Sequence, residues 1–252
     1  MHSLDETLLI TAELGEKKVK KTLLAKWILG FIGGAMIAIG YMAFVILSSN
    51  IPGGMGQLLG ASVFPIGLIV ILFAGGELIT GNMMVVATSF FSGKVTLKEL
   101  ANNWLVITLA NIVGAMFVSY VFGIYLGILT PHQETLVKLA QGKVHYDPLR
   151  TLVSGIGCNW FVGLACWLSY AGKDGFGKFI GVWFPIMVFV LLGFQHSVAN
   201  TFLLSAGNYF GAVSISEFAL NFIFSYIGNI IGGAVFVGLF YKLCQSPKPH
   251  NQ

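Results

Sequence analysis

The chain has 252 residues and a formal net charge of +4, with 56% hydrophobic and 10% charged residues. Soluble domains carry about 25% charged residues, so this composition excludes a water-soluble globular protein, and its apolar content excludes a disordered chain. Three cysteines, Cys158, Cys166 and Cys244, are too few for a disulfide framework and lack metal-ligand spacing, so neither a metal nor a cofactor is expected. The lysines are scattered rather than clustered, which argues against a nucleic-acid partner. The composition therefore indicates a polytopic membrane protein in a lipid bilayer.

Six apolar segments are long enough to cross the hydrocarbon core, which takes about 20 residues of helix. In chain order they are 27–47, 58–91, 104–129, 152–170, 179–204 and 218–243. The second and the fifth are interrupted near their middle by polar, glycine-containing stretches, 75–82 and 193–200. We therefore predict an all-α membrane protein with six transmembrane helices in one domain, 1–252, and with broken helices 2 and 5.

The positive residues predict the orientation of the chain. With six spans, most lysines lie on the side that holds the N-terminal segment, the 2–3 loop, the 4–5 loop and the C-terminal tail. The opposite side has only Lys138, Lys143 and Arg150, in the 3–4 loop. Lysine and arginine are enriched in cytoplasmic loops. We therefore expect a multi-pass protein of the cell membrane with a cytoplasmic N-terminal segment, 1–25, and a cytoplasmic tail, 244–252.

An internal repeat relates the two halves of the chain at an offset of 118 residues. The offset matches these pairs: Gly75 and Gly193, Glu77 and Gln195, Asn82 and Asn200, Glu99 and Glu217, Asn103 and Asn221, Asn111 and Asn229, Gly114 and Gly232. Three spans in each half place the halves in opposite orientations, as in inverted-repeat transporters. Non-helical backbone at membrane depth is tolerated only where protein buries it or where it lines a water-filled path. The two breaks are thus the predicted substrate route, where half-helix N-termini offer an anion a positive field.

Polar residues within the spans are the candidates for function. Glu77 is the only acid inside a span, where a charge costs about 2.5–3.5 kcal/mol, and both a structural ion pair and a transport role fit it. His196 is the only span histidine and lies in the second break, which favours a functional role. Short polar groups that can hydrogen-bond an oxyanion or the broken backbone are Thr80, Asn82, Asn159 and Asn200. No nucleophile–base arrangement is present, so an enzyme is not expected.

Several motifs together resemble the formate/nitrite transporter family, which includes formate, nitrite and hydrosulfide channels. They are GELITGN (76–82), NW…NIVGA (103–115), GCNWFVGLACW (157–167), GFQHSVAN (193–200) and GNIIGG (228–233). The resemblance extends from about residue 8 to residue 243. It implies an aquaporin-like protomer, assembled as a homopentamer with one substrate pore in each protomer.

The resemblance also implies a pore in which two apolar constrictions enclose a central histidine. The outer constriction would be Phe64, Val162 and Phe189, and the inner one Leu68, Leu78 and Ile79. His196 and Asn159 would lie between them, and Thr80 would lie in a mobile loop of the first break. Family motifs match Lys18, Glu77 and Asn82 to the inner vestibule, and Lys143 and Asn200 to the outer one.

Two residues depart from the family pattern. Ile79 stands where an aromatic residue is frequent, so the inner slit is expected to be wider or differently gated. Gln195 stands where a glutamate usually precedes the histidine. A neutral Gln195 cannot balance the charge of Lys143, so we expect the outer vestibule to attract anions more strongly; substitution of Gln195 with glutamate tests this.

The sequence thus predicts a channel or transporter for small monovalent weak-acid anions, such as formate, nitrite or hydrosulfide, that is proton-linked and pH-dependent. Burial disfavours the charged form and raises the pKa of the substrate. The substrate then crosses as a neutral acid, protonated by water or His196, or as an anion past a protonated His196. Either version predicts that substitution of His196 changes the pH dependence. The alternatives are a neutral-solute channel for water, glycerol or ammonia, although aquaporin Asn-Pro-Ala breaks are lacking, and a membrane scaffold or sensor.

Overall fold

A computed structural model describes residues 1–246, and these residues are helical apart from short connections. After α1 (Leu4–Val19) follow α2 (Leu23–Asn50), α3 (Gly54–Val63), α4 (Ile66–Val70), η1 (Ile71–Gly75), α5 (Ile79–Phe91), α6 (Leu97–Phe117), η2 (Val118–Tyr125), η3 (Thr130–His132), α7 (Gln133–Val144), α8 (Pro148–Ala171), α9 (Gly175–Leu191), α10 (Ser197–Tyr209), α11 (Ile215–Ile230), η4 (Ile231–Leu239) and α12 (Phe240–Leu243). The segments η1, η2 and η4 are π-helical continuations of the helices before them.

The all-helical membrane fold is confirmed. Among residues 1–246, five continuous helical runs are long and apolar enough to cross a bilayer: 23–50, 54–75, 97–125, 148–171 and 215–243. The remaining crossing is the broken pair of α9, an apolar helix of 17 residues, and α10. The second run is likewise followed by a break and by α5. The membrane-spanning helices thus correspond to the six predicted spans, with breaks in the second and the fifth.

Both breaks are shorter than the sequence suggested. The predicted interruptions were 75–82 and 193–200, but non-helical backbone is confined to 76–78 and to 194–196, after a turn at 192–193. The polar residues after each break already belong to α5 and α10. The helices begin early because an asparagine side chain accepts the first amide of each one: Asn111 accepts from Ile79, and Asn229 accepts from Ser197.

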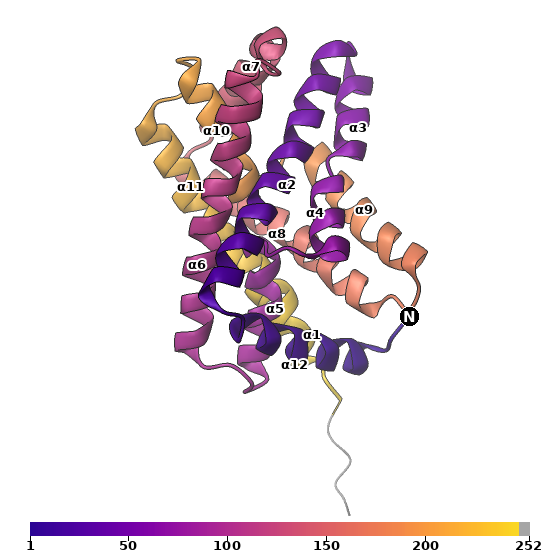
Figure 1. Cartoon of the computed structure of the whole chain (residues 1–252). Helices are drawn as coiled ribbons and strands as arrows, with labels where there is room; N and C mark the ends of the chain where they lie inside the picture. The colour runs from indigo at the N-terminus through magenta and orange to yellow at the C-terminus, as the bar shows by residue number, and fades with distance from the viewer. Residues whose placement is uncertain (247–252) are drawn as a thin grey trace, which may run out of the picture.

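The structure reproduces the internal repeat in the bounds of its helices. An offset of 118 carries α5, 79–91, onto α10, 197–209, and carries the run 97–125 onto the run 215–243. Both of these longer runs begin with a capping box, in which Thr96 pairs with Glu99 and Ser214 with Glu217. The equivalent helices of the two halves lead to opposite ends of the molecule (Figure 1).

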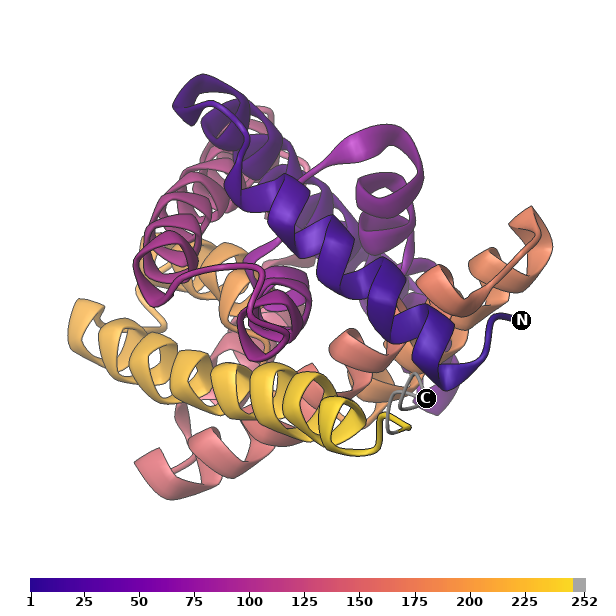
Figure 2. The same cartoon turned by 90° about the horizontal axis from the view of Figure 1, so that it is seen from below.

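The two ends of the bundle carry different elements. Helix α1 lies across one end, and α7 lies at the other (Figure 1); seen along the bundle, α1 crosses the helices diagonally (Figure 2). The predicted N-terminal segment 1–25 therefore contains a docked helix. Its buried face includes Leu8 and Ala12, and the Ser89 hydroxyl donates to the Ala12 carbonyl at 2.7 Å. Of the predicted tail 244–252, positions 247–252 lie outside the described residues.

Glycines allow the long helices to approach within backbone contact. A Cβ atom on Gly114 would lie 2.1 Å from the carbonyl oxygen of Phe31, and one on Gly34 would lie 2.0 Å from that of Asn111. The equivalent Gly232 of the second half would meet the Ile156 carbonyl at 2.3 Å. Backbone atoms cannot yield as a flexible side chain does, so these positions require glycine.

We expect Gly114→Ala to lower the unfolding temperature of the detergent-purified protein. Overpacking of a close contact costs typically about 1–3 kcal/mol, and here the clashing atom is a backbone carbonyl. The measurement is thermal unfolding followed by intrinsic fluorescence. Gly142→Ala in α7 is the matched control, because a Cβ there meets no atom within 4 Å. Equal unfolding temperatures for the two variants would contradict the packing argument.

Candidate transport pore

The two helix breaks meet at a buried polar contact. Thr80 is the second residue of α5, and its hydroxyl oxygen lies 3.0 Å from Nε2 of His196, the N-cap residue of α10. Both side chains are buried. The expectation that Thr80 lies in a mobile loop is wrong: the residue is in the first turn of α5, because Asn111 caps that turn at Ile79.

The hydrogen bonds of His196 define its protonation state in this conformation. Its Nδ1 accepts from the backbone amide of Ala199 at 3.0 Å. A nitrogen that accepts carries no proton, so the ring proton is on Nε2 and the imidazole is neutral. The Nε2–H group therefore donates to the Thr80 hydroxyl, whose own hydrogen is left free to donate elsewhere. Protonation of Nδ1 would place two N–H groups against each other and remove the cap of α10.

Asn159 of α8 joins this centre through its amide. Its Nδ2 donates to the carbonyl oxygen of Thr80 at 3.1 Å and to that of Asn229 at 2.6 Å. The carbonyl oxygen Oδ1 is buried and has no hydrogen-bond partner among residues 1–246. An unsatisfied buried acceptor costs about 1–3 kcal/mol. The centre therefore has a free acceptor on Asn159 as well as a free donor on Thr80.

Apolar side chains lie next to the polar centre. The rings of Phe64 and Phe189 meet edge to face, with centroids 5.8 Å apart, and Phe189 stacks on the His196 ring at 5.9 Å. All six residues of the two predicted constrictions are buried: Phe64, Val162, Phe189, Leu68, Leu78 and Ile79. Leu78 and Ile79 lie at the end of the first break, at the start of α5. The structure thus brings Phe64 and Phe189 together directly beside His196.

An ion pair lies at the α1 end of the first break. Lys18 of α1 donates to the Glu77 carboxylate at 2.8 Å, and the Asn82 amide donates to the same oxygen at 2.8 Å. Asn82 also donates to Asn103 of α6 at 3.0 Å. The three residues that the sequence assigned to the inner vestibule are therefore in contact, and the ion pair attaches α1 to the break.

The equivalent network at the α7 end lacks a charge-paired lysine. The Gln195 Oε1 accepts from Asn200 and Asn221, while its Nε2 donates to the backbone carbonyl of Lys143 at 3.0 Å. The Lys143 ammonium instead donates to the carbonyl oxygens of Gly193 and Phe194, both at 2.8 Å. No described carboxylate lies within ion-pair distance of it. Burial lowers the pKa of Lys143 to about 8, so the group remains mostly charged at neutral pH.

Four asparagines that the sequence analysis matched only as repeat pairs hold the breaks in place. Asn111 donates to the carbonyls of Gly30 and Glu77, and Asn229 donates to those of Gly155 and Gln195. The other two are Asn103 and Asn221, which accept from Asn82 and Asn200. Their occurrence at the 118-residue offset is the signal in the sequence for this role. Taken one at a time, these asparagines have no sequence feature that indicates this role, and only the comparison of the two halves of the chain reveals it.

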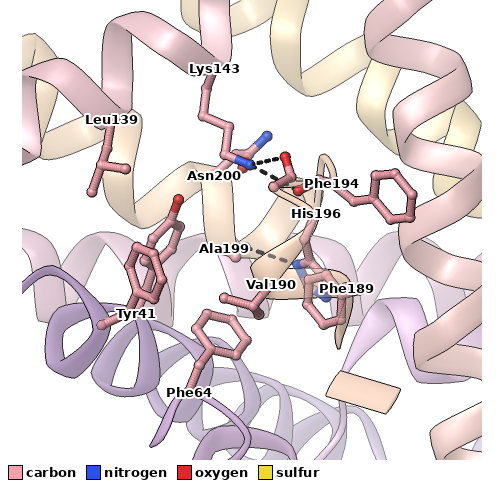
Figure 3. Close-up of a pocket in the computed structure, with 12 residues that line it drawn as sticks. Tyr41, Phe64, Leu139, Lys143, Phe189, Val190, Phe194, His196, Ala199 and Asn200 are labelled. Carbon is pink, nitrogen blue, oxygen red and sulfur yellow. Dashed lines mark hydrogen bonds between the residues drawn. The ribbon is translucent and has the colours of Figure 1, made fainter. Parts of the chain in front are cut away.

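Two neighbouring cavities lie between α7 and the polar centre. A cavity of about 490 Å³ is lined by polar groups that include Lys138, Lys143 and Gln195. A smaller cavity of about 70 Å³ shares Leu139, Lys143 and Gly193 with it and reaches Phe64, Phe189 and His196. Figure 3 shows Lys143 at one end of this smaller cavity and the phenylalanine rings at the other.

A polar centre between apolar side chains, at the junction of two broken membrane helices, defines a channel or transporter rather than an enzyme. A family model described as formate/nitrite transporter matches residues 5–243. The chain belongs to the formate/nitrite transporter family, as the motifs suggested.

The chain is similar to proteins described as channels and transporters, and the similarity covers nearly their whole length. YrhG of Bacillus subtilis, described as an uncharacterized transporter, is 46% identical, and the match covers 98% of this chain and 95% of YrhG. The formate channel BtFdhC of Bacillus thuringiensis is 45% identical, and the match covers 99% of this chain and 98% of BtFdhC. The formate channel FocA of Escherichia coli is 30% identical, and the match covers 92% of this chain and 90% of FocA. The prediction of a membrane transport protein without enzymatic activity is confirmed.

Solved structures share the fold. An FNT family ion channel superimposes with a TM-score of 0.89 at 24% identity, covering 95% of this chain and 99% of its own. A pentameric formate channel with formate bound superimposes with a TM-score of 0.75 at 27% identity, covering 89% and 98%. The six-helix arrangement with two breaks is therefore that of the family.

Proposed function

We propose that this protein conducts small monovalent anions of weak acids, formate foremost, together with a proton. The observation that supports this proposal is one cavity lined by Lys143, by apolar rings and by the neutral donor His196. Among residues 1–246, Lys143 has no carboxylate partner. Lys143 raises the local concentration of anions, and the rings exclude a hydrated charge. The similarity to the formate channels BtFdhC and FocA supports formate as the first substrate to test.

The energetics favour transfer as the neutral acid. A bare anion between Phe64 and Phe189 would lose its hydration without a countercharge, whereas its acid loses much less. Desolvation raises the pKa of the substrate as it leaves Lys143. Because the His196 ring is neutral and its Nδ1 is engaged by Ala199, water rather than His196 supplies the proton. Thr80 and Asn159 then offer a donor and an acceptor to the acid at the centre.

We further propose roles for the remaining candidate residues. The apolar set forms the two constrictions, the polar network around each break supports it, and neutral Gln195 leaves the α7-end vestibule positive. The excess of lysines at the α1 end supports a cytoplasmic position for that end. The similarity to a pentameric formate channel supports a homopentamer with one pore in each protomer.

The test is uptake by proteoliposomes of the purified protein, with formate, nitrite, hydrosulfide and glycerol compared at two pH values. These are pH 5.5 and pH 7.5, about one unit below and above the ordinary pKa of histidine. We expect saturable formate uptake that is faster at the lower pH, and no glycerol uptake. Glycerol or water flux without anion flux would place the protein among neutral-solute channels. Absence of all flux, in protein that remains folded, would support a scaffold or sensor.

A further inference from the structure

Tyr41, on the membrane-spanning helix α2, has a buried side chain whose hydroxyl opens on a cavity. The residue is 6% exposed, it lines the cavity of about 70 Å³, and its hydroxyl forms no hydrogen bond with any other residue from 1 to 246. Its ring packs edge to face on Phe44 and Phe64, with centroids 5.6 Å apart in both pairs, and lies 5.9 Å from Phe202. The ring therefore has a packing role, whereas the hydroxyl has none within the protein.

The hydroxyl faces the cavity of about 70 Å³ described above, which Tyr41 lines together with Lys143 and Asn200. In Figure 3 it points toward the side of the cavity where Leu139, Lys143 and Asn200 lie, away from the Phe64 ring. A hydroxyl that has no hydrogen-bond partner in the surrounding protein and opens on a cavity can bond whatever polar molecule occupies that cavity. The cavity has room for more than one water, and therefore for a small polar ligand in place of water.

The donors in this cavity suit an oxyanion. Two of the three Lys143 N–H groups are taken by the carbonyls of Gly193 and Phe194, so one remains. The Tyr41 O–H is a second donor without an acceptor. Asn200 turns its Nδ2 toward Gln195 and Asn221, and its Oδ1 has no partner among the described residues. The cavity thus offers two donors for the two oxygens of a small carboxylate.

We propose that Tyr41 is a substrate-binding residue: its hydroxyl and the remaining N–H of Lys143 bind the two oxygens of formate in this cavity, before the anion enters between Phe64 and Phe189. The inference rests on the proposed function and assigns the substrate a waiting position on the α7 side of the constriction. Tyr41 thereby favours anions with two hydrogen-bonding oxygens.

The test is Tyr41→Phe, which removes the hydroxyl and retains the ring contacts. We expect the formate concentration for half-maximal uptake to rise by about tenfold or more, the equivalent of one lost hydrogen bond to a charged group, with the maximal rate changed much less. Tyr226→Phe is the matched control, because the Tyr226 hydroxyl contacts Thr108 at 2.8 Å and lines none of the described cavities near Lys143. Unfolding temperatures of both variants verify the fold.

The outcomes separate this inference from the proposed function. If the wild-type protein transports formate and Tyr41→Phe has the same half-saturation, the hydroxyl binds only water and the inference is wrong. A fall in maximal rate at unchanged half-saturation would also overturn it, since that pattern indicates a packing role. If the wild-type protein transports no anion, the proposed function itself fails.

Discussion

Substitution of His196 with asparagine is expected to leave the fold intact and to make formate flux fall more steeply with rising pH. Asparagine retains an acceptor for the Ala199 amide and is a favoured N-cap residue, so α10 keeps its start. It lacks the Nε2–H donor that lies 3.0 Å from Thr80. Without that donor, the polar centre stabilises the substrate less while it acquires its proton from water. Flux then depends more closely on the fraction of neutral acid in bulk water, which changes by about tenfold per pH unit.

The size of the effect follows from the lost hydrogen bond. A hydrogen bond between neutral groups contributes about 0.5–1.5 kcal/mol, so flux at pH 7 is expected to fall by about two- to tenfold. The measurement is the initial rate of formate uptake by proteoliposomes from pH 5 to pH 8, a range of about 1.5 units on either side of an ordinary histidine pKa.

His196→Phe separates the pore role from the capping role. Phenylalanine removes both the donor to Thr80 and the acceptor for Ala199. The variant is therefore expected to show a changed pH profile and, in addition, a loss of about 0.5–2 kcal/mol in stability from the missing cap. A pH profile that superimposes on that of the wild type, in folded protein of either variant, would show that His196 only caps α10.

The pattern of the sequence was sufficient for the fold because the two halves repeat each other. The 118-residue offset compares polar residues in two independent copies, so matches such as Asn111 with Asn229 carry weight that a single glycine-rich helix lacks. The bounds of α5 and α10 then agree with the offset at both ends. Hydrophobic length predicted the spans, since the bilayer fixes how many apolar residues a helix needs.

The details of the pore could not be predicted, because they depend on hydrogen bonds between residues far apart in the chain. The asparagine caps from α6 and α11 convert polar residues such as Thr80 from loop to helix. Lys143 was expected to act beside Gln195, but its ammonium binds backbone carbonyls of the second break. Tyr41 looks in the sequence like any aromatic residue of a membrane helix, and only the cavity beside it singles out its hydroxyl.

Substitution of Glu77 with glutamine is expected to destabilise the α1 end of the molecule. Glu77 is 2% exposed and the Lys18 side chain is 16% exposed, so removal of the carboxylate leaves an ammonium group that is mostly withdrawn from water. Breaking a buried ion pair costs about 3–5 kcal/mol, and the partial exposure of Lys18 places this case toward the lower value. Thermal unfolding in detergent and the proteolytic sensitivity of α1 are the measurements.

The double variant Lys18→Met with Glu77→Gln identifies the cause. It removes both charges, and the glutamine oxygen can still accept from Asn82, as Gln195 accepts from Asn200 in the second half. We therefore expect it to recover most of the stability lost in Glu77→Gln, since replacement of both members of a buried pair is often neutral. Lys20→Met is the control, because the Lys20–Glu16 pair is closer, at 2.6 Å, but lies at the surface, where water screens it. Equal losses of stability in the double and the single variant would mean that Glu77 stabilises the break through Asn82 alone. Burial would then not explain why the Lys18–Glu77 pair contributes more than the closer Lys20–Glu16 pair.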